Sequence, residues 1–525
     1  MGIDGVQKVG QEFYGNIGSS SFKPFEALEI LRFEEMLEWE EWVCREIEFP
    51  CLKVLYIKEC PKLKKDLPKH LPKLTKLEIR ECKQLVCCLP MAPSIRKLEL
   101  EECDDVVVRS AGSLTSLASL DISNVCKIPD ELGQLHSLVE LYVRFCPELK
   151  EIPPILHNLT SLKNLNIQGC ESLASFPEMA LPPMLEGLQI FSCPILESLP
   201  EGMMQNNTTL QYLDIHSCRS LRSLPRDIDS LKKLSIYECK KLELALPEDM
   251  THNHYASLTQ LNITNSCDSL TSFPLASFTK LEYLFIENCG NLESLYIPDG
   301  LHHVDLTSLQ SLSISNCPNL VSFPRGGLPT PNLRLLRILR NCEKLKSLPQ
   351  GMHTLLTSLQ DLYIYDCPEI DSFPEGGLPT NLSELYIISC NKLVANPMEW
   401  GLQTLPFLRS LMIGGCEKER FPEERFLPST LTSLEIWGFP NLKSLDNKGL
   451  QHLTSLETLE ISKCEKLKSF PKQGLPSSLS RLYIQGCPLL KKRCQRNKGK
   501  EWPNISHIPC IAFDRYTKNE EVILS

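Results

Sequence analysis

Thiol groups are the most reactive side chains that recur regularly in this sequence. The chain contains 24 cysteines, and most of them occupy one position of a repeated apolar pattern. A thiol set of this size could form disulfides or bind zinc. Eighteen cysteines share the repeated position, namely Cys60, Cys82, Cys103, Cys126, Cys146, Cys170, Cys193, Cys218, Cys239, Cys267, Cys289, Cys317, Cys342, Cys367, Cys390, Cys416, Cys464 and Cys487.

We expect a structural role for these thiols. A zinc site needs ligands that converge on one point, and a row of cysteines spread along a repeated chain cannot surround an ion. A thiol placed once per repeat instead behaves as a small buried hydrophobic group and a weak hydrogen-bond partner. The sequence therefore predicts no metal site. The opening residues have no apolar signal-peptide core, which predicts a cytoplasmic protein, and reduced thiols fit that compartment.

Motifs for catalysis or nucleotide binding are missing from the sequence. Gly499 and Lys500 are followed by Glu501 and lack the upstream glycine that a phosphate-binding loop requires. The sequence also has no G-x-S-x-G motif, which places a nucleophilic serine on a sharp turn. We therefore predict neither an enzyme nor a bound cofactor.

The cysteines are positioned by units of the form L-x-x-L-x-I-x-x-C-x-x-L/I-x-x-F/L-P. Copies occur at Leu162–Pro177, Leu359–Pro374 and Leu456–Pro471. The period of about 24 residues lies within the range of a leucine-rich repeat. The L-x-I alternation predicts a short strand with Leu and Ile pointing inward and the residues between them pointing outward. The following proline ends each strand because it cannot donate a hydrogen bond to the next one.

These features predict an α/β-type leucine-rich-repeat solenoid, or horseshoe. A long parallel β-sheet is expected on the concave face, with mostly irregular loops and a few short helices on the convex face. Pro129–Leu135 is one such short helix candidate. The expected organisation is a linker or truncated edge over 1–24, a solenoid of about 20 repeats over 25–489, and a basic cap and tail over 490–525.

Composition narrows the classes of partner. With 42% hydrophobic and 23% charged residues the chain resembles a soluble globular protein. A formal net charge of −10 argues against binding nucleic acid by bulk electrostatics. No apolar run is long enough for a membrane span. The basic stretch Lys491–Lys500 leaves a nuclear targeting role open beside that of a solvated cap.

The outward positions of the strands carry the information on binding. They vary from repeat to repeat, and the early repeats present mainly charged residues. The later repeats present a group of large side chains, Tyr363, Tyr365, Tyr386, Ile388, Met412 and Trp437. Exposed aromatic residues gathered on a sheet are typical of a protein-binding hot spot. The alternative is that strands simply favour aromatic residues and that a loop or neighbouring domain covers them.

Three motifs together resemble the repeat region of plant intracellular immune receptors, the nucleotide-binding leucine-rich-repeat (NLR) class with an N-terminal coiled coil. They are the cysteine-containing unit with G-L-P spacers such as Gly327–Thr330, the acidic opening Glu38–Trp42, and the closing W-P-N-I-S-H-I-P of Trp502–Pro509. The resemblance covers nearly the whole chain. It implies a disease-resistance module that binds a pathogen effector or a guarded host protein through the concave face and restrains a neighbouring nucleotide switch.

The chain departs from that class in one respect and leaves alternatives open. It has no match to the coiled coil or the nucleotide-binding module, so the resemblance implies neither ATP binding nor self-activation. The opening Met1–Gly5 resembles sequence interior to such receptors and suggests a fragment, a truncated gene model or a repeat-only paralogue. The alternative functions are a repeat-only adaptor or decoy, a ubiquitin-ligase substrate receptor and a non-functional remnant. An extracellular receptor domain would need a signal peptide, paired cap cysteines and L-x-G-x-I-P repeats, none of which appear in the sequence.

Overall fold

The computed structural model describes residues 5–14, 25–43, 49–176, 181–204, 209–226, 228–244, 255–297, 306–496 and 498–514. The chain forms two compact units. Unit 1 comprises Met1–Leu258 with Asn265–Ser269, and unit 2 comprises Thr259–Thr264 with Leu270–Ser525.

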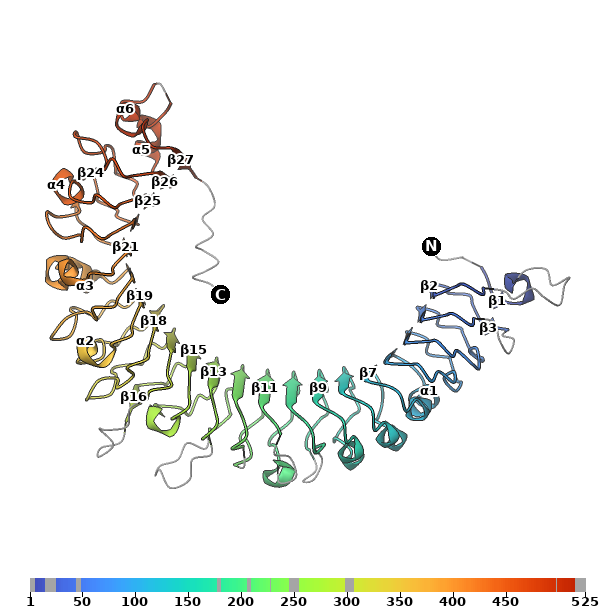
Figure 1. Cartoon of the computed structure of the whole chain (residues 1–525). Coiled ribbons are helices and arrows are strands. Elements are labelled where there is room, and N and C mark those ends of the chain that lie inside the picture. Colours follow the sequence, from blue (N-terminus) through green and yellow to red (C-terminus); the bar gives the residue numbers. More distant parts are fainter. Residues whose placement is uncertain are drawn as a thin grey trace. The chain divides into compact units, whose positions relative to one another are not determined.

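Each unit is built around a parallel sheet whose neighbouring strands follow one another along the chain (Figure 1). The strands of unit 1 are β2 (Ile30–Glu34), β4 (Val54–Lys58), β5 (Lys76–Arg80), β6 (Lys97–Glu101), β7 (Ser119–Ser123), β8 (Glu140–Arg144), β9 (Asn164–Gln168), β10 (Gly187–Phe191), β11 (Tyr212–His216) and β12 (Lys233–Tyr237). The strands of unit 2 are β13 (Gln260–Thr264), β15 (Tyr283–Glu287), β17 (Ser311–Ser315), β18 (Leu335–Leu339), β19 (Asp361–Tyr365), β20 (Glu384–Ile388), β21 (Ser410–Gly414), β23 (Ser433–Trp437), β25 (Thr458–Ser462), β26 (Arg481–Gln485) and β27 (Cys510–Phe513).

The strand pairs are in register, so equivalent residues of successive coils stand side by side. Leu362 of β19 is the partner of Leu385 of β20, and Ile364 is the partner of Ile387. All four side chains are buried. The inward rows of Leu and Ile therefore form the core, and the predicted leucine-rich-repeat solenoid with a parallel sheet is confirmed.

A left-handed residue follows every strand of the two sheets. After β4 this residue is Glu59, with φ of 53°, and after β5 it is Glu81, with φ of 54°. The amide of Glu59 donates to the carbonyl oxygen of Arg80 at 3.0 Å, so the turn extends the ladder between coils. The sharp turn reverses the direction in which the chain leaves the strand and brings the next side chains, including the cysteine, into the core.

The return segments lie on the side of each unit away from its sheet, and the helices in their described parts are short, as predicted (Figure 1). The α-helices are α1 (Asp105–Ser110), α2 (Met352–Leu355), α3 (Asn391–Ala395), α4 (Asn447–Leu450), α5 (Pro488–Arg493) and α6 (Trp502–Ile505). The 3₁₀ helices are η1 (Gln11–Tyr14), η2 (Ala111–Ser113), η3 (Asp130–Gln134), η4 (Pro154–Asn158), η5 (Glu201–Met204), η6 (Leu275–Ser277), η7 (Pro397–Trp400) and η8 (Leu402–Thr404). The η3 turn lies within the candidate helix Pro129–Leu135. Short parallel pairs join β1 (Lys8–Val9) to β3 (Glu41–Trp42), β14 (Ser272–Pro274) to β16 (Ser294–Tyr296), and β22 (Arg420–Phe421) to β24 (Ser444–Leu445).

An aromatic cluster closes the first coil of unit 1. Trp39 and Trp42 are buried, and the indole Nε1 of Trp42 donates to the hydroxyl oxygen of Tyr14 at 2.8 Å. Residues 5–14 therefore belong to the first coil rather than to a linker, whereas 1–4 and 15–24 lie outside the described residues. The acidic opening is neutralised by the next coil, since Lys62 pairs with Glu38 at 2.7 Å.

A helical cap follows the last repeat of unit 2. Helices α5 and α6 lead into β27, which pairs with β26 and so adds one more strand to the sheet. Two cations of the cap have partners there, because Lys491 pairs with Asp514 and Arg493 pairs with Glu501. A targeting role for Lys491–Lys500 stays a prediction.

The cysteines occupy the inner side of the turn after each strand. Sixteen of the eighteen register cysteines are buried, while Cys103 is partly buried and Cys126 is exposed. The thiol of Cys390 donates to the carbonyl oxygen of Ile388 at 3.3 Å and approaches that of Ile364 in the preceding coil at 3.7 Å. Burial raises the pKa of Cys103 to about 12, which keeps this group a neutral thiol.

The expected register is wrong at Cys126. Val125 is 3% exposed and fills the inner position of this turn, whereas Cys126 faces solvent. The preceding strand residue Ile122 lies three positions before Val125, which is the usual spacing between the Ile and the inner residue of the turn. The apolar valine therefore takes the core position, and the thiol one residue later is displaced outward.

Within the described ranges, no helix has both the length and the apolar character that crossing a membrane requires. No three His, Cys, Asp or Glu side chains converge there as they would around a metal ion.

Candidate protein-binding surface

The outward residues of unit 2 form two straight rows because the strands pair in register. The middle position of each strand forms one row, with Tyr363, Tyr386, Met412, Glu435, Glu460 and Tyr483 on β19, β20, β21, β23, β25 and β26. The last position forms the other row, with Tyr365, Ile388, Gly414, Trp437, Ser462 and Gln485. The topology therefore brings the six predicted site residues together on four neighbouring strands.

Tyr363 and Tyr386 are the closest pair in this group. Their ring centroids lie 4.7 Å apart with an interplanar angle of 80°, an edge-to-face arrangement. The hydroxyl of Tyr363 donates to Oε2 of Glu384 at 2.8 Å, and the guanidinium of Arg337 lies 5.2 Å from the Tyr363 ring centroid. Burial and the neighbouring carboxylate of Glu384 raise the pKa of Tyr363, so the phenol stays neutral. The pair is held in one orientation before any partner binds.

Trp437 lies over a glycine of the neighbouring strand. A Cβ atom at Gly414 would stand 2.8 Å from the carbonyl oxygen of Trp437, 3.1 Å from its Cε3 and 3.3 Å from Cγ2 of Ile388. The missing side chain therefore makes room for both the backbone and the indole of Trp437. The ammonium of Lys463 lies 4.8 Å from the Trp437 ring centroid, within the range of a cation–π interaction.

The structure corrects the expected exposure of two residues. Tyr363, Tyr365, Tyr386 and Trp437 are partly exposed, as the outward position requires. Ile388 and Met412, however, are each only 4% exposed. Met412 stands between Tyr386 and Glu435 in its row. Ile388 stands between Tyr365 and Gly414, and the indole of Trp437 lies beside that glycine. The four aromatic residues therefore supply the accessible surface, and Ile388 and Met412 lie beneath or between them.

A carboxyl pair continues the middle row beyond Met412. Glu435 and Glu460 are direct partners on β23 and β25, and neither forms a salt bridge within the described ranges. Burial, followed by repulsion from Glu460, raises the pKa of Glu435 to about 8. Burial also raises the pKa of Glu460. The surface beside the aromatic residues is therefore less negative at neutral pH than two glutamates would suggest.

Unit 1 contains an aromatic group that the sequence analysis did not single out. Phe191, His216 and Tyr237 occupy the last position of β10, β11 and β12. The ring of His216 lies 4.6 Å from that of Phe191 and 4.2 Å from that of Tyr237, stacked on the latter. Burial lowers the pKa of His216, so the imidazole is mainly neutral near pH 7. The sequence signal that could have identified this group is the occurrence of aromatic residues at the same outward position of three consecutive repeats.

The charged residues of the early repeats neutralise one another. Glu78 and Glu99 are 2% and 7% exposed although they stand at outward positions. Lys76 bridges both carboxylates, at 2.9 Å from Glu78 and 3.1 Å from Glu99, and Arg80 reaches Glu99 at 2.7 Å. These side chains form one network of ion pairs, so the charges in this part of unit 1 are largely paired.

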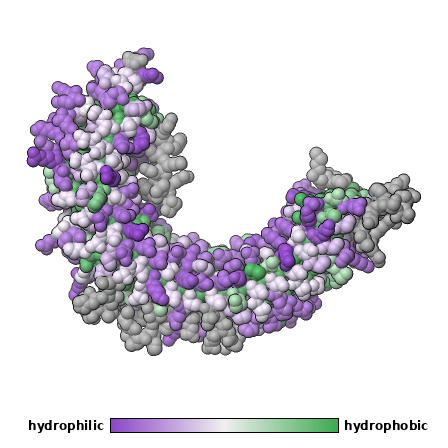
Figure 2. All heavy atoms as spheres, in the orientation of Figure 1, coloured by the Kyte–Doolittle hydropathy of each residue, from purple (hydrophilic) through white to green (hydrophobic). Residues whose placement is uncertain are grey.

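The surface in view is polar over most of its area. Figure 2 shows hydrophilic residues across the face in view, with hydrophobic residues in small separate groups. Phe285 of β15 and Tyr483 of β26 are further aromatic residues at the middle position in unit 2, but they lie on strands outside this group. We call Tyr363, Tyr365, Tyr386 and Trp437 the aromatic face.

Comparison with known proteins agrees with the repeat pattern. No protein-family model matches the sequence. A disease resistance protein of Arabidopsis thaliana is 34% identical over 542 aligned residues, which cover 85% of this chain and 38% of that protein. The disease resistance RPP13-like protein 1 of the same plant is 31% identical over 35% of this chain and 17% of its own length. TMV resistance protein N of Nicotiana glutinosa is 30% identical over 31% of this chain and 14% of its own length.

The chain is a leucine-rich-repeat relative of plant disease resistance proteins. The resemblance seen in the sequence is thereby confirmed. This leucine-rich-repeat chain spans less than half of the length of each of these relatives.

Solved structures of other proteins align less well. The TLR13–ssRNA13 complex aligns over 94% of this chain and 82% of its own, with a TM-score of 0.49 and 17% identity. A leucine-rich-repeat protein of Leptospira interrogans aligns over 87% of this chain and 95% of its own, with a TM-score of 0.43 and 20% identity. The repeats and the strand pairing of the chain itself establish its fold.

Proposed function

We propose that this chain is a recognition module of plant disease resistance that binds a protein partner through the aromatic face of unit 2. The observation that carries the proposal is the gathering of four partly exposed aromatic residues on three strands of one sheet, β19, β20 and β23. The disease resistance proteins among its relatives support the biological setting.

The aromatic face has the physical properties of a binding hot spot. Tyrosine and tryptophan bury a large area with few rotatable bonds, so ordering them on binding costs little entropy. Tyr363 and Tyr386 are already fixed by ring contact and by a hydrogen bond to Glu384. The covered neighbours Ile388 and Met412 give the exposed rings a rigid support.

The partner that we propose is a pathogen effector or a host protein that the receptor guards. In a full receptor the same repeats would restrain a nucleotide-binding domain until that partner binds. We place the chain in the cytoplasm, where its buried thiols would remain reduced. We propose a binding role and no catalytic one, because the inward rows of the sheet are packed as a core and the outward rows form a surface for a partner.

Proximity labelling in plant leaf cells provides the test. The chain would be fused to a labelling enzyme and compared with a variant carrying Tyr363→Ala, Tyr365→Ala, Tyr386→Ala and Trp437→Ala. Each protein labelled by the first and not by the second would be purified and its affinity for both measured. We expect the affinity of the variant to be at least roughly 30-fold lower, because the loss of even one hot-spot residue costs about 2 kcal/mol.

A matched control replaces aromatic residues at the same strand position in unit 1. Tyr56 and Tyr142 occupy the middle position of β4 and β8, as Tyr363 and Tyr386 do in unit 2. Tyr56→Ala and Tyr142→Ala should leave the affinity unchanged. Equal affinity of the four-residue variant and the unaltered chain for every purified partner would refute the assignment of the surface.

The alternative functions make different predictions in the same experiment. A repeat-only adaptor or decoy would bind its partner in plants that lack any larger form of the chain. A substrate receptor would bring ubiquitin-ligase subunits into the labelled set, and their labelling would not depend on the aromatic face. A non-functional remnant would label no protein that binds the unaltered chain more tightly than the four-residue variant.

A further inference from the structure

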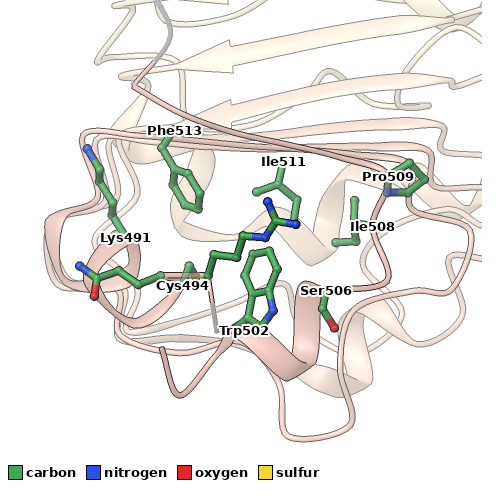
Figure 3. A pocket seen from close by; sticks show the side chains of 10 residues that line it. Lys491, Cys494, Trp502, Ser506, Ile508, Pro509, Ile511 and Phe513 are labelled. Atoms are coloured by element: carbon green, nitrogen blue, oxygen red, sulfur yellow. The ribbon is translucent and has the colours of Figure 1, made fainter. Parts of the chain in front are cut away.

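A pocket of about 620 Å³ lies in the cap of unit 2, away from the aromatic face. Its apolar walls come from two elements, with Ile511 and Phe513 on β27 and Trp502 at the start of α6. Figure 3 shows the side chains of Phe513, Ile511 and Trp502 pointing toward the same space. The volume lies within the roughly 300–1,000 Å³ that ligand sites usually have.

The walls of the pocket are only partly covered. Trp502, Ile511 and Phe513 are each partly exposed, while Ile508 and Cys494 form a buried floor. The lining is mixed, with Gln495 and Ser506 beside the apolar side chains. The part formed by Trp502, Ile511 and Phe513 would gain free energy by accepting aliphatic side chains, because burying apolar area is favourable.

The rim of the pocket is basic. Lys491 and Arg496 both line it and both are exposed. Lys491 already pairs with Asp514, whereas no salt bridge of Arg496 is formed within the described ranges. A ligand for this pocket therefore needs an aliphatic part for the walls and a carboxylate for Arg496.

The chain itself contains a stretch with this chemistry. Residues 515–525 directly follow the described part of the cap, and they include two acidic residues, Glu520 and Glu521, and then three aliphatic ones, Val522, Ile523 and Leu524. We propose that the pocket binds the stretch 519–525 of the same molecule, with the carboxylates at the basic rim and the aliphatic side chains against Trp502, Ile511 and Phe513.

The connection is long enough and favours binding within one molecule. Phe513 is a wall of the pocket, and Glu520 follows Asp514 by six residues, which span up to about 20 Å when extended. A ligand on so short a tether experiences an effective concentration of the order of millimolar. An intrinsic dissociation constant of roughly 0.1 mM would then leave the pocket filled about ten to one. A partner peptide of similar chemistry would have to displace 519–525.

Amide hydrogen exchange on the full chain tests the proposal. In the unaltered protein the amides of 519–524 should exchange about tenfold more slowly than in a variant with Ile523→Asp and Leu524→Asp, because a tenfold occupancy protects them to that extent. Both substitutions lie outside the described fold. The protection should not depend on protein concentration.

Charge reversal tests the rim. Arg496→Glu should abolish the slow exchange of 519–524, and combining it with Glu520→Arg and Glu521→Arg should restore it. Lys498→Glu is the matched control, because Lys498 is an exposed cation of the same cap that does not line the pocket; it should leave the slow exchange in place. Protection that grows with protein concentration would show capture by a second copy and overturn binding within one molecule. Exchange of 519–524 at the unprotected rate in the unaltered chain would overturn the proposal altogether.

Discussion

Glu435 on β23 stands directly beside Glu460 on β25, two like charges at equivalent positions of neighbouring strands. Burial and the second carboxylate raise the pKa of Glu435 from its ordinary value of 4.5 to about 8. Near pH 7 this side chain therefore holds a proton in most molecules. The pair lies next to Met412 and Trp437, so its charge affects the surface that we propose for partner binding.

Glu435→Gln should stabilise unit 2 above neutral pH. Between the ordinary pKa of 4.5 and the folded value of about 8 the folded chain binds more protons than the unfolded chain, so stability falls as pH rises through this window. Glutamine resembles the protonated acid and does not ionise, so the variant should keep its stability as pH rises through this window. We expect a gain on the order of 2 kcal/mol at pH 8.5 after allowance for partial exposure, and no difference near pH 4.

Exchange protection of β23 measured against pH would check this. Glu465→Gln is the control, since Glu465 is an exposed glutamate of the same unit. A variant whose stability follows the pH dependence of the unaltered chain would contradict the raised pKa of Glu435.

Glu99→Gln should destabilise unit 1, whereas Glu435→Gln should stabilise unit 2. Burial disfavours the Glu99 carboxylate, but Lys97, Arg80 and Lys76 together outweigh it and lower the pKa to about 2. A lowered pKa stabilises the fold above the ordinary value of 4.5, and this contribution is lost as pH falls through about 2.

We expect Glu99→Gln to destabilise unit 1 at pH 7 by on the order of 2 kcal/mol, with the difference shrinking as pH approaches 2. Urea denaturation of both proteins at pH 7 and pH 3 measures it. If the loss of stability were as large at pH 3 as at pH 7, the ion network would not be its cause.

The repeat pattern predicts the core because the alternation of side chains along each strand determines both the spacing of Leu and Ile in the sequence and their burial. Leu362 and Ile364 point inward in a strand whose alternate residues face opposite sides, and the same two letters recur in each unit. Composition also predicts the short return helices, since proline and glycine interrupt longer ones. These features depend on residues close together in the sequence.

Exposure at the candidate surface could not be predicted in the same way. Whether Met412 is covered depends on the rows formed by neighbouring strands, and the position of Trp437 depends on Gly414, a residue 23 positions earlier. Likewise, Tyr14 contacts Trp42 only because the first coil folds back on itself. Contacts between distant residues decide these details, and a pattern within one repeat does not contain them.

The left-handed turn after each strand offers a stabilising substitution. Glu81 has a φ of 54° and an exposed side chain. A side chain in this conformation costs roughly 1–2 kcal/mol, and glycine avoids that cost while adding about 0.4–1 kcal/mol of unfolded-state entropy. Glu81→Gly should therefore stabilise unit 1 by about 0.5–1 kcal/mol in urea denaturation. The exposed neighbour Gln84, where φ is not positive, serves as control, and Gln84→Gly should destabilise.

The register of the coil after β7 can be tested by deleting side-chain atoms at two adjacent positions. Val125 is buried and Cys126 is exposed, the reverse of what the cysteine pattern predicts. Val125→Ala should create a cavity and destabilise unit 1 by on the order of 1–2 kcal/mol, whereas Cys126→Ala should stay within about 0.5 kcal/mol of the unaltered chain.

Cys146, the buried register cysteine of the next coil, gives the comparison. Cys146→Ala should destabilise as Val125→Ala does, because both remove a side chain that the core surrounds. Alkylation of the native protein with iodoacetamide, followed by mass spectrometry, supplies an independent measurement: Cys126 should react at once and Cys146 only after unfolding. Rapid alkylation of Cys146, together with a large loss of stability on Cys126→Ala, would show that Cys126 and not Val125 fills the core position, and would refute this register.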